Sequence, residues 1–417
     1  MINTKALLSG ITRQIKVHGK DIQILITPTQ FRDTLLKLSS GVQFRSRISS
    51  LYVGNNENEQ QIISNLVASV KQNESDVSVI IDRYRGLRDG GLVFKDLRKV
   101  SPIYLYQTPF ISRFGYKKPS PFGEFLGVHH IKYYLFDDTV IISGANLSDL
   151  YFGPRQDRYM VIKSKPFADY ICYVHQLHAT SAKLWDPSYY TKSHWSSETL
   201  QVAKTMTETF SSNTPIDNNE TRDLGPRDGD TFIYPLFQVP WFSVRQIDDT
   251  IDLLLSRATS KDTFTCSSGY FNPTSRMLES LKQTKAQVNI IIPSVEANGF
   301  YKGSFIKGFI PDMYNLSAVR TLRKCPNVNI VEYSKDNWSY HAKGWWFNDL
   351  TIIGSSNFNQ RSSVRDTEFC VAMITECKQL LESLEDEKNR LILSSSVLKN
   401  TYRTIASFTL PLMSNFL

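Results

Sequence analysis

The feature that most constrains this chain is an internal repeat, in which two segments 211 residues apart align without a gap. In both segments a lysine follows a histidine by two residues, an asparagine by sixteen and an acid by twenty-seven. The two sets are His130, Lys132, Asn146 and Asp157, and His341, Lys343, Asn357 and Glu368. Two matching four-point patterns of polar residues predict two copies of one structural unit.

The spacing within each copy suits a site that binds phosphate. Side chains at i and i+2 of an extended strand point to one face, so His130 and Lys132 can reach the same phosphate. An imidazole can act as nucleophile or general acid, and lysine and asparagine stabilise charge on phosphoryl oxygens. The acid that ends each copy can fix the tautomer of a ring. Each copy therefore predicts four candidate catalytic side chains.

A fifth polar position differs between the copies. Asp137 lies seven residues after His130, and this odd separation turns it away from the histidine if the strand stays regular. We therefore include Asp137 in the catalytic motif but interpret it as a structural, hydrogen-bonding acid. The second copy has Asn348 at this position and Asp349 one residue later.

The duplicated H-x-K-x4-D pattern resembles the signature of the phospholipase D superfamily. The resemblance implies an α/β fold in which two phospholipase D-like lobes form one composite active site. Apolar spacing predicts helices over 55–72, 246–258, 275–284 and 377–398. They alternate with extended segments in both halves, which agrees with packed α/β layers. Residues 210–229 (FSSNTPIDNNETRDLGPRDG) have the composition of a linker. We expect an N-terminal lobe at 1–209 and a C-terminal lobe at 230–417.

Longer strings favour one branch of the superfamily. SGANLSDLYFGPRQDRY at 143–159 looks like the mitochondrial phosphatidylglycerophosphate synthases, and so do SYHAKGW at 339–345 and GSSNFNQRS at 354–362. This resemblance implies transfer of the phosphatidyl group of CDP-diacylglycerol to glycerol 3-phosphate, with release of CMP. The alternatives are a CDP-diacylglycerol:serine phosphatidyltransferase, a phospholipase D that uses water, and a non-enzymatic lipid-binding scaffold. The complete histidine, lysine and asparagine sets argue against the last.

The family resemblance also implies roles for the repeated residues. His130 would form a covalent phosphatidyl-histidine, and His341 would protonate CMP and then deprotonate the acceptor. Asp157 and Glu368 would orient the rings, each acid serving the ring of its own lobe or that of the other lobe. No cofactor and no metal is expected, because two lysines take the electrostatic role of a cation. Candidate substrate-binding residues nearby are Arg155, Arg158, Ser355, Arg361 and Arg365.

Charge and aromatic residues suggest a partner surface. Lys and Arg exceed Asp and Glu by 8, which favours phosphate-bearing partners. Two loops mix aromatic and basic residues, a composition that suits an anionic membrane surface better than nucleic acid. The candidate membrane contacts are Phe110, Phe114, Phe122, Phe125, Phe300 and Phe305. No segment is long and apolar enough to cross a bilayer.

Other features set the expected environment. Five cysteines without a C-x-x-C spacing favour a reducing compartment. The basic first twenty residues fit the remnant of a transit peptide or an ordinary terminus. By resemblance we expect a mitochondrial protein on the matrix side of the inner membrane. His175 and His178 have a spacing that can hold a metal, but without a third ligand we interpret them as part of an ordinary helix face.

Overall fold

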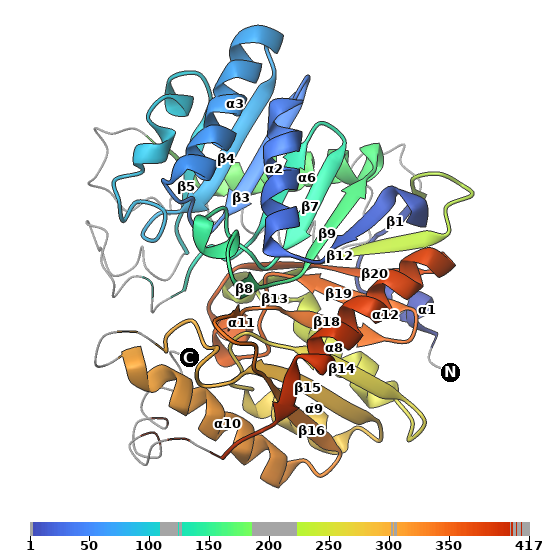
Figure 1. Ribbon diagram of the computed structural model, residues 1–417. Helices are drawn as coiled ribbons and strands as arrows, with labels where there is room; N and C mark the ends of the chain where they lie inside the picture. Colours follow the sequence, from blue (N-terminus) through green and yellow to red (C-terminus); the bar gives the residue numbers. More distant parts are fainter. Residues whose placement is uncertain are drawn as a thin grey trace.

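Two mixed β-sheets face one another in the computed structural model, which describes residues 3–108, 124, 127–185, 223–301, 303, 307–400, 402, 406 and 410 (Figure 1). Each sheet carries one copy of the sequence repeat. The repeat begins just before a β-hairpin in both sheets: β6 (Tyr133–Phe136) and β7 (Thr139–Ser143) in the first, and β18 (Gly344–Phe347) and β19 (Leu350–Gly354) in the second.

The first sheet has eight described strands in the order β10-β5-β4-β3-β6-β7-β9-β2. Strands β3, β4 and β5 are parallel, and the other pairs are antiparallel. The further bounds are β2 Ile22–Leu25, β3 Arg45–Ser50, β4 Asp76–Asp82, β5 Ile103–Tyr106, β9 Tyr159–Lys163 and β10 Lys183–Leu184.

Helices cover both faces of this sheet. On one face lie α2 (Pro28–Ser40) and α3 (Glu57–Asn73), and α6 (Lys165–Ser181) lies on the other. The alternation of β6 explains this: Tyr134 and Phe136 point into the core with α2 and α3, whereas Tyr133 and Leu135 point into the core with α6.

The second sheet follows the order β11-β1-β12-β20-β19-β18-β14-β15-β16-β21, with β13 beside β12. Its further bounds are β1 Gln14–Val17, β11 Asp223–Leu224, β12 Thr231–Val239, β13 Val244–Arg245, β14 Thr263–Ser267, β15 Gln287–Pro293, β16 Val328–Tyr333, β20 Glu368–Thr375 and β21 Ser395–Val397. Helices α8 (Gln246–Arg257), α9 (Ser275–Gln283) and α10 (Ile310–Lys324) contribute to the core on its outer face.

A shared hydrophobic core joins the two sheets. It combines apolar residues of β6, β7, β9 and α6 with residues of β12 and β20, and with Leu380 and Leu384 of α12 (Lys378–Leu393). The rings of Phe237 and Phe369 pack in a tilted arrangement with centroids 4.8 Å apart, and Tyr133 meets Phe369 edge-on at 6.1 Å. The lobes are therefore held together by continuous burial of apolar surface rather than by a few polar contacts.

The first strand crosses between the halves. β1, which follows α1 (Thr4–Ser9), pairs with β12 and β11 of the second sheet, although it precedes β2 of the first sheet by only a few residues. The two-lobe fold is confirmed by likeness to solved proteins given below. The proposed division at 210–229 stays a prediction, but it places β1 with the lobe whose sheet it does not join.

Most segments expected from the sequence are present. The helix expected over 55–72 is α3, and those expected over 246–258 and 275–284 are α8 and α9. The C-terminal helix expected over 377–398 ends earlier than predicted, because α12 stops at Leu393 and the edge strand β21 follows. Leu391 is buried on α12 as expected, whereas Val397, which lies in β21, is 81% exposed.

Candidate active site

The first histidine lies where its lobe meets the second sheet. His130 and Lys132 immediately precede β6, and the backbone here pairs in parallel with the residues before β20: His130 N donates to Thr367 O at 2.9 Å, and Thr367 N donates to Val128 O at 2.9 Å. This bridge brings Glu368, the first residue of β20, next to the histidine of the other lobe.

The second copy repeats this exchange in the opposite direction. The short strand β17 (Ser339–Tyr340) pairs in parallel with β8 (Arg155–Gln156) of the first lobe. His341 N then donates to Gln156 O at 2.8 Å. Asp157 follows β8 directly, so it lies beside the histidine of the second lobe. Each lobe therefore supplies the acid for the other lobe's histidine, as expected from the resemblance.

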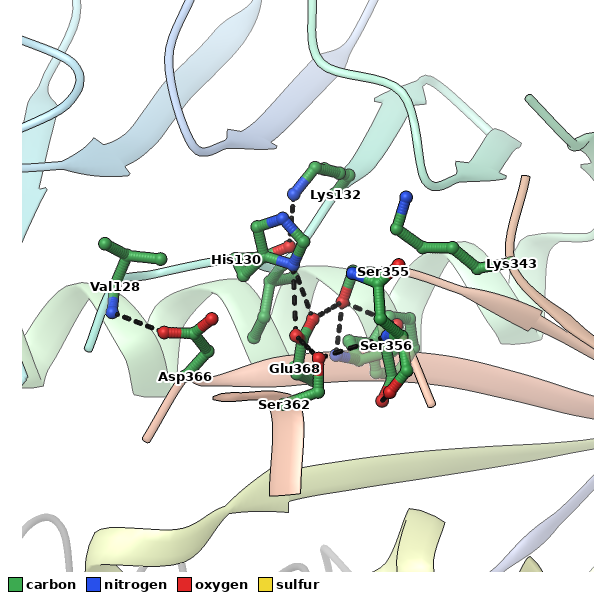
Figure 2. A network of polar contacts seen from close by, with 12 residues as sticks. Val128, His130, Lys132, Lys343, Ser355, Ser356, Ser362, Asp366 and Glu368 are labelled. Atoms are coloured by element: carbon green, nitrogen blue, oxygen red, sulfur yellow. Dashed lines mark hydrogen bonds and ion pairs between the residues drawn. The ribbon is translucent and has the colours of Figure 1, made fainter. Parts of the chain in front are cut away.

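Glu368 fixes one tautomer of His130. His130 Nδ1 lies 3.0 and 2.9 Å from the two carboxylate oxygens, as Figure 2 shows. The carboxylate also accepts hydrogen bonds from Ser362 Oγ, at 2.6 Å, and from Ser355 Oγ. Since a carboxylate accepts, Nδ1 carries the proton and Nε2 keeps its lone pair. His130 is thus arranged as a nucleophile.

His341 has a different environment. Its Nδ1 lies 2.7 Å from Asp157 Oδ2, but Lys343 Nζ also lies 2.7 Å from Nδ1 and 3.1 Å from Nε2. Burial lowers the pKa of His341 well below its usual value, and the charge of Lys343 lowers it further. Burial also raises the pKa of Asp157 to about 6. In the absence of substrate, this ring is therefore neutral.

The two lysines lie inside the site rather than at its surface. Lys132 Nζ donates to His130 O at 2.6 Å and Lys343 Nζ to His341 O at 2.7 Å, so each lysine folds back over its own histidine. Both are buried, and burial lowers the pKa of Lys132 to about 7 and that of Lys343 to about 8. Two buried cations that bond to no carboxylate in the described ranges favour binding of an anion between them.

The two asparagines are held near the strand ends. Asn146 Nδ2 donates to Tyr151 Oη at 3.1 Å, and its Oδ1 accepts from Ser50 Oγ at 3.4 Å. Asn357 Oδ1 accepts from the backbone N–H of Tyr270 at 3.2 Å. The structure thus brings all four repeated positions of each copy to one junction between the sheets.

Asp137 belongs to a turn and not to the catalytic centre. It has φ 52° in the two-residue β6–β7 hairpin, and its carboxylate accepts N–H groups of Gln43, Phe44 and Arg45. Counting Asp137 among the catalytic residues is therefore corrected, whereas its interpretation as a structural acid is confirmed. Asn348 has φ 50° at the same place of the β18–β19 hairpin, and both Asn and Asp tolerate this left-handed conformation.

Arg158 is the clearest departure from the expected substrate-binding set. Its side chain is 1% exposed, pairs with Glu387 of α12 at 2.8 Å, donates to Ile352 O at 2.9 Å, and stacks 3.7 Å above the Trp346 ring. A guanidinium with its donors used in this way cannot take a substrate phosphate. The structure assigns Arg158 to the junction between the lobes.

The remaining candidates also have partners within the protein. Arg361 pairs with Asp366 at 2.9 Å, and Asp366 in turn accepts from Val128 N at 3.0 Å (Figure 2). Ser355 binds Glu368, and the carbonyl of Arg365 accepts from Trp241 Nε1 at 2.7 Å. Arg155 instead contacts Tyr151 and Tyr270, and no carboxylate among the described residues bonds to its guanidinium.

Most candidate membrane residues lie outside the described residues, namely Phe110, Phe114, Phe122, Phe125 and Phe305. Phe300 is described: it is half-buried and packs on Tyr270 with ring centroids 5.5 Å apart. No helix in the described ranges is long and apolar enough to cross a bilayer.

His175 is part of the core, where it bonds to Tyr133 and Ser78, and His178 Nδ1 lies 3.0 Å from Val174 O. Across the described part of the chain, no group of three or more potential metal ligands is present.

Two tyrosines near His341 were not predicted. Tyr151 and Tyr270 meet the imidazole edge-on, with ring centroids 5.2 and 5.4 Å away. Tyr151 stands in a string that carries the family resemblance, but the second copy has Ser362 at the matching position, and Tyr270 lies outside both copies. A search restricted to positions shared by the two copies therefore misses them.

Known proteins resemble the chain over nearly its whole length. It is 31% identical to the mitochondrial CDP-diacylglycerol–glycerol-3-phosphate 3-phosphatidyltransferase of Gallus gallus, over 94% of this chain and 82% of that protein. The corresponding protein of Homo sapiens is 29% identical, with 94% and 81% covered, and that of Saccharomyces pastorianus is 29% identical, with 93% and 85% covered.

Fold and family comparisons agree with this likeness. The family described as "Cardiolipin synthase, PLD-like domain" matches residues 254–392. The crystal structure of phosphatidylserine synthase from Haemophilus influenzae superposes over 100% of both chains with a TM-score of 0.76 at 20% identity, which shows the shared two-lobe fold. From the sequence match and the paired histidine motifs, the chain belongs to the CDP-diacylglycerol–glycerol-3-phosphate 3-phosphatidyltransferase family of the phospholipase D superfamily.

Proposed function

We propose that this protein transfers the phosphatidyl group of CDP-diacylglycerol to glycerol 3-phosphate and releases CMP. The relatives named above carry this activity in their names and match nearly the full chain. The observation that carries the proposal is that both histidine–acid pairs are complete and crossed between the lobes, at 2.9 Å and 2.7 Å. A chain that had kept only the fold would have no need to preserve both pairs.

In the first step His130 is the nucleophile. Its Nε2 lone pair attacks the phosphorus that carries diacylglycerol, a phosphorus–nitrogen bond forms, and the bond to the CMP oxygen breaks. His341 gives its proton to that oxygen. Glu368 stabilises the positive charge that develops on the His130 ring, because its carboxylate accepts Nδ1–H throughout.

In the second step His341 is the base. It takes the proton of an acceptor hydroxyl, the hydroxyl oxygen attacks phosphorus, and the bond to His130 breaks. His130 therefore keeps the covalent role and His341 the proton-transfer role in both steps, and each is restored at the end of the cycle.

Lys343 explains how a ring that is neutral without substrate becomes an acid. In the free protein its ammonium group lies against the ring nitrogens of His341 and disfavours protonation. A bound diphosphate attracts this ammonium group and adds negative charge near the ring. Both changes raise the pKa of His341, so binding of the anionic substrate is coupled to uptake of a proton.

The discriminating experiment is a product assay with purified protein and CDP-diacylglycerol in mixed micelles. We expect phosphatidylglycerophosphate with glycerol 3-phosphate, and little product with serine or water. A preference for serine would indicate a phosphatidylserine synthase, and phosphatidic acid formed regardless of acceptor would indicate a phospholipase D. Absence of CMP release with every acceptor would reject an enzymatic role.

We also propose that the protein acts at the matrix side of the mitochondrial inner membrane through the two aromatic and basic loops. The diacylglycerol chains cannot leave the bilayer easily, at about 0.8 kcal/mol for each exposed CH₂. Co-sedimentation with anionic liposomes should weaken with added salt and weaken further in Phe110→Ser/Phe114→Ser. Sedimentation that responds to neither change would place attachment elsewhere.

A further inference from the structure

Arg155 forms no ion pair among the described residues, although it lies beside the candidate site. Arg158 pairs with Glu387 and Arg361 with Asp366, whereas Arg155 makes only two long hydrogen bonds, each of 3.4 Å, to Ser339 Oγ and Tyr270 Oη. Its Nε is buried without a hydrogen-bond partner. A partly buried cation with an unsatisfied, buried Nε is costly unless an anion completes its contacts.

The surroundings of Arg155 form a cradle for its guanidinium group. The group lies 4.7 Å from the centre of the Tyr151 ring, a cation–π contact that holds it without using its donors. Gly299 closes the other side, since a Cβ there would lie 2.8 Å from Arg155 Nη1 and 3.3 Å from Tyr270 Oη. The position of the group is therefore fixed while several of its N–H donors stay available.

This cradle lies one aromatic ring away from His341. Tyr151 and Tyr270, which both contact Arg155, are also the two rings that meet the His341 imidazole edge-on at 5.2 and 5.4 Å. Because the same two rings contact both groups, a short acceptor with a hydroxyl at one end and a phosphate at the other can lie against them. Its hydroxyl can reach His341 while its phosphate reaches Arg155.

Building on the proposed function, we infer that Arg155, held by Tyr151, Tyr270 and Gly299, binds the phosphate monoester of the acceptor and thereby selects glycerol 3-phosphate over acceptors that lack a phosphate. Bidentate guanidinium–phosphate contacts are strong and directional, which suits selection by a single residue. The phosphate that reacts is instead held by the lysines and asparagines of the repeat.

The test compares two half-reactions in Arg155→Gln. Exchange of labelled CMP into CDP-diacylglycerol requires no acceptor, whereas transfer to glycerol 3-phosphate requires the acceptor phosphate. We expect kcat/KM for glycerol 3-phosphate to fall about 100-fold, exchange to fall by less than about fivefold, and the preference for glycerol 3-phosphate over glycerol to collapse. Arg155→Lys should keep an intermediate preference, since it keeps the charge but not the fork.

Two further variants test whether the position of the Arg155 guanidinium matters and whether loss of any arginine has the same effect. Gly299→Ala keeps the charge of Arg155 but displaces its guanidinium, so it should also lower the preference for glycerol 3-phosphate over glycerol. Arg276→Gln, which removes an arginine paired with Asp249 on the surface of the second lobe, serves as the matched control and should leave both half-reactions unchanged.

The outcomes distinguish this inference from the proposed function. If Arg155→Gln keeps the wild-type preference for glycerol 3-phosphate over glycerol, the inference is wrong and the proposed function stands. If exchange falls as much as transfer, Arg155 holds CMP instead, and selection of the acceptor is rejected. If the wild-type protein exchanges CMP but does not use glycerol 3-phosphate, the proposed function and this inference both fail.

Discussion

The two copies of the repeat share one geometry but not one electrostatic environment. His130 has a single strong partner at Nδ1, a carboxylate that two serine hydroxyls also hold. His341 has a carboxylate and an ammonium group competing at the same nitrogen. The first arrangement keeps one tautomer in place, and the second lets the proton content of the ring depend on where Lys343 lies.

The difference shows how the two copies of a duplicated motif can take different catalytic roles. A nucleophile needs a fixed lone pair, and a proton carrier needs a pKa that changes during the reaction. The residue types at the shared positions are nearly identical, so the division depends on what surrounds them. If the environments differ in this way, matched variants of the two copies should have different effects.

The largest effect is expected for the histidines themselves. His130→Ala and His341→Ala should each lower turnover of CDP-diacylglycerol by about 10⁴-fold or more, because neither ring can replace the other. Steady-state CMP release measures this, with circular dichroism to confirm folding. Retention of more than a few per cent of activity in both variants contradicts a single composite site.

A substrate whose leaving group needs no proton distinguishes the nucleophile from the proton carrier. With p-nitrophenol in place of CMP on the phosphatidyl group, His341→Ala should still release a burst of nitrophenolate and accumulate adduct, whereas His130→Ala should release none. A burst from His130→Ala but not from His341→Ala would reverse the assignment.

The acids that orient the two histidines should show the same difference in roles, with smaller losses of turnover. Glu368→Gln and Asp157→Asn should each lower turnover of CDP-diacylglycerol by about 10² to 10³-fold, since the wrong tautomer or orientation is then favoured. With the p-nitrophenol substrate, Asp157→Asn should recover the burst and Glu368→Gln should not. Equal recovery in both variants would show that the acids act on both histidines alike.

The ion pair at the junction between the lobes should affect the stability of the protein. Arg158→Met leaves Glu387 buried without its partner, which should lower the free energy of unfolding by about 3 to 5 kcal/mol. Replacing both, as Arg158→Met/Glu387→Leu, should recover most of this loss. Urea denaturation measures both variants, and a double variant no more stable than the single one would mean that stacking on Trp346, not the ion pair, matters.

The charge of the two lysines should determine how kcat/KM falls at alkaline pH. Because burial lowers the pKa of Lys132 to about 7 and that of Lys343 to about 8, kcat/KM for CDP-diacylglycerol should fall as pH rises through these values, when the ammonium groups lose their charge. Lys132→Arg should remove the earlier decline, since arginine stays charged. An unchanged alkaline profile in this variant would assign the decline to another group.

The smallest effect is expected at the position where the motifs differ. Asn348→Asp should change activity by less than about twofold and stability by less than about 0.5 kcal/mol, because both residues tolerate φ 50°. Asn348→Val, the control, should cost about 1 to 2 kcal/mol. Inactivation of a well-folded Asn348→Asp protein would contradict the equivalence of the two hairpin turns.

The sequence predicted the local elements and the repeated site well, for a physical reason. Helices such as α3 follow periodic burial, strands such as β15 form short apolar runs, and the crossed acids belong to a motif whose spacing recurs. The contacts of Arg158, Tyr151 and Tyr270 were not predictable in this way. They depend on which segments the tertiary fold brings together, and a buried arginine and a substrate-binding arginine look alike in a sequence.

The placement of β1 affects how the chain folds during synthesis. This strand leaves the ribosome before the other strands of both sheets, and its antiparallel partner β12 follows about 200 residues later, which at usual elongation rates means roughly 10 to 40 s. During that interval residues 14–17 have neither neighbour of the final sheet, because β11 also comes late. The nascent first lobe therefore carries an unpaired strand, a feature that invites chaperone binding and non-native pairing until the second half emerges.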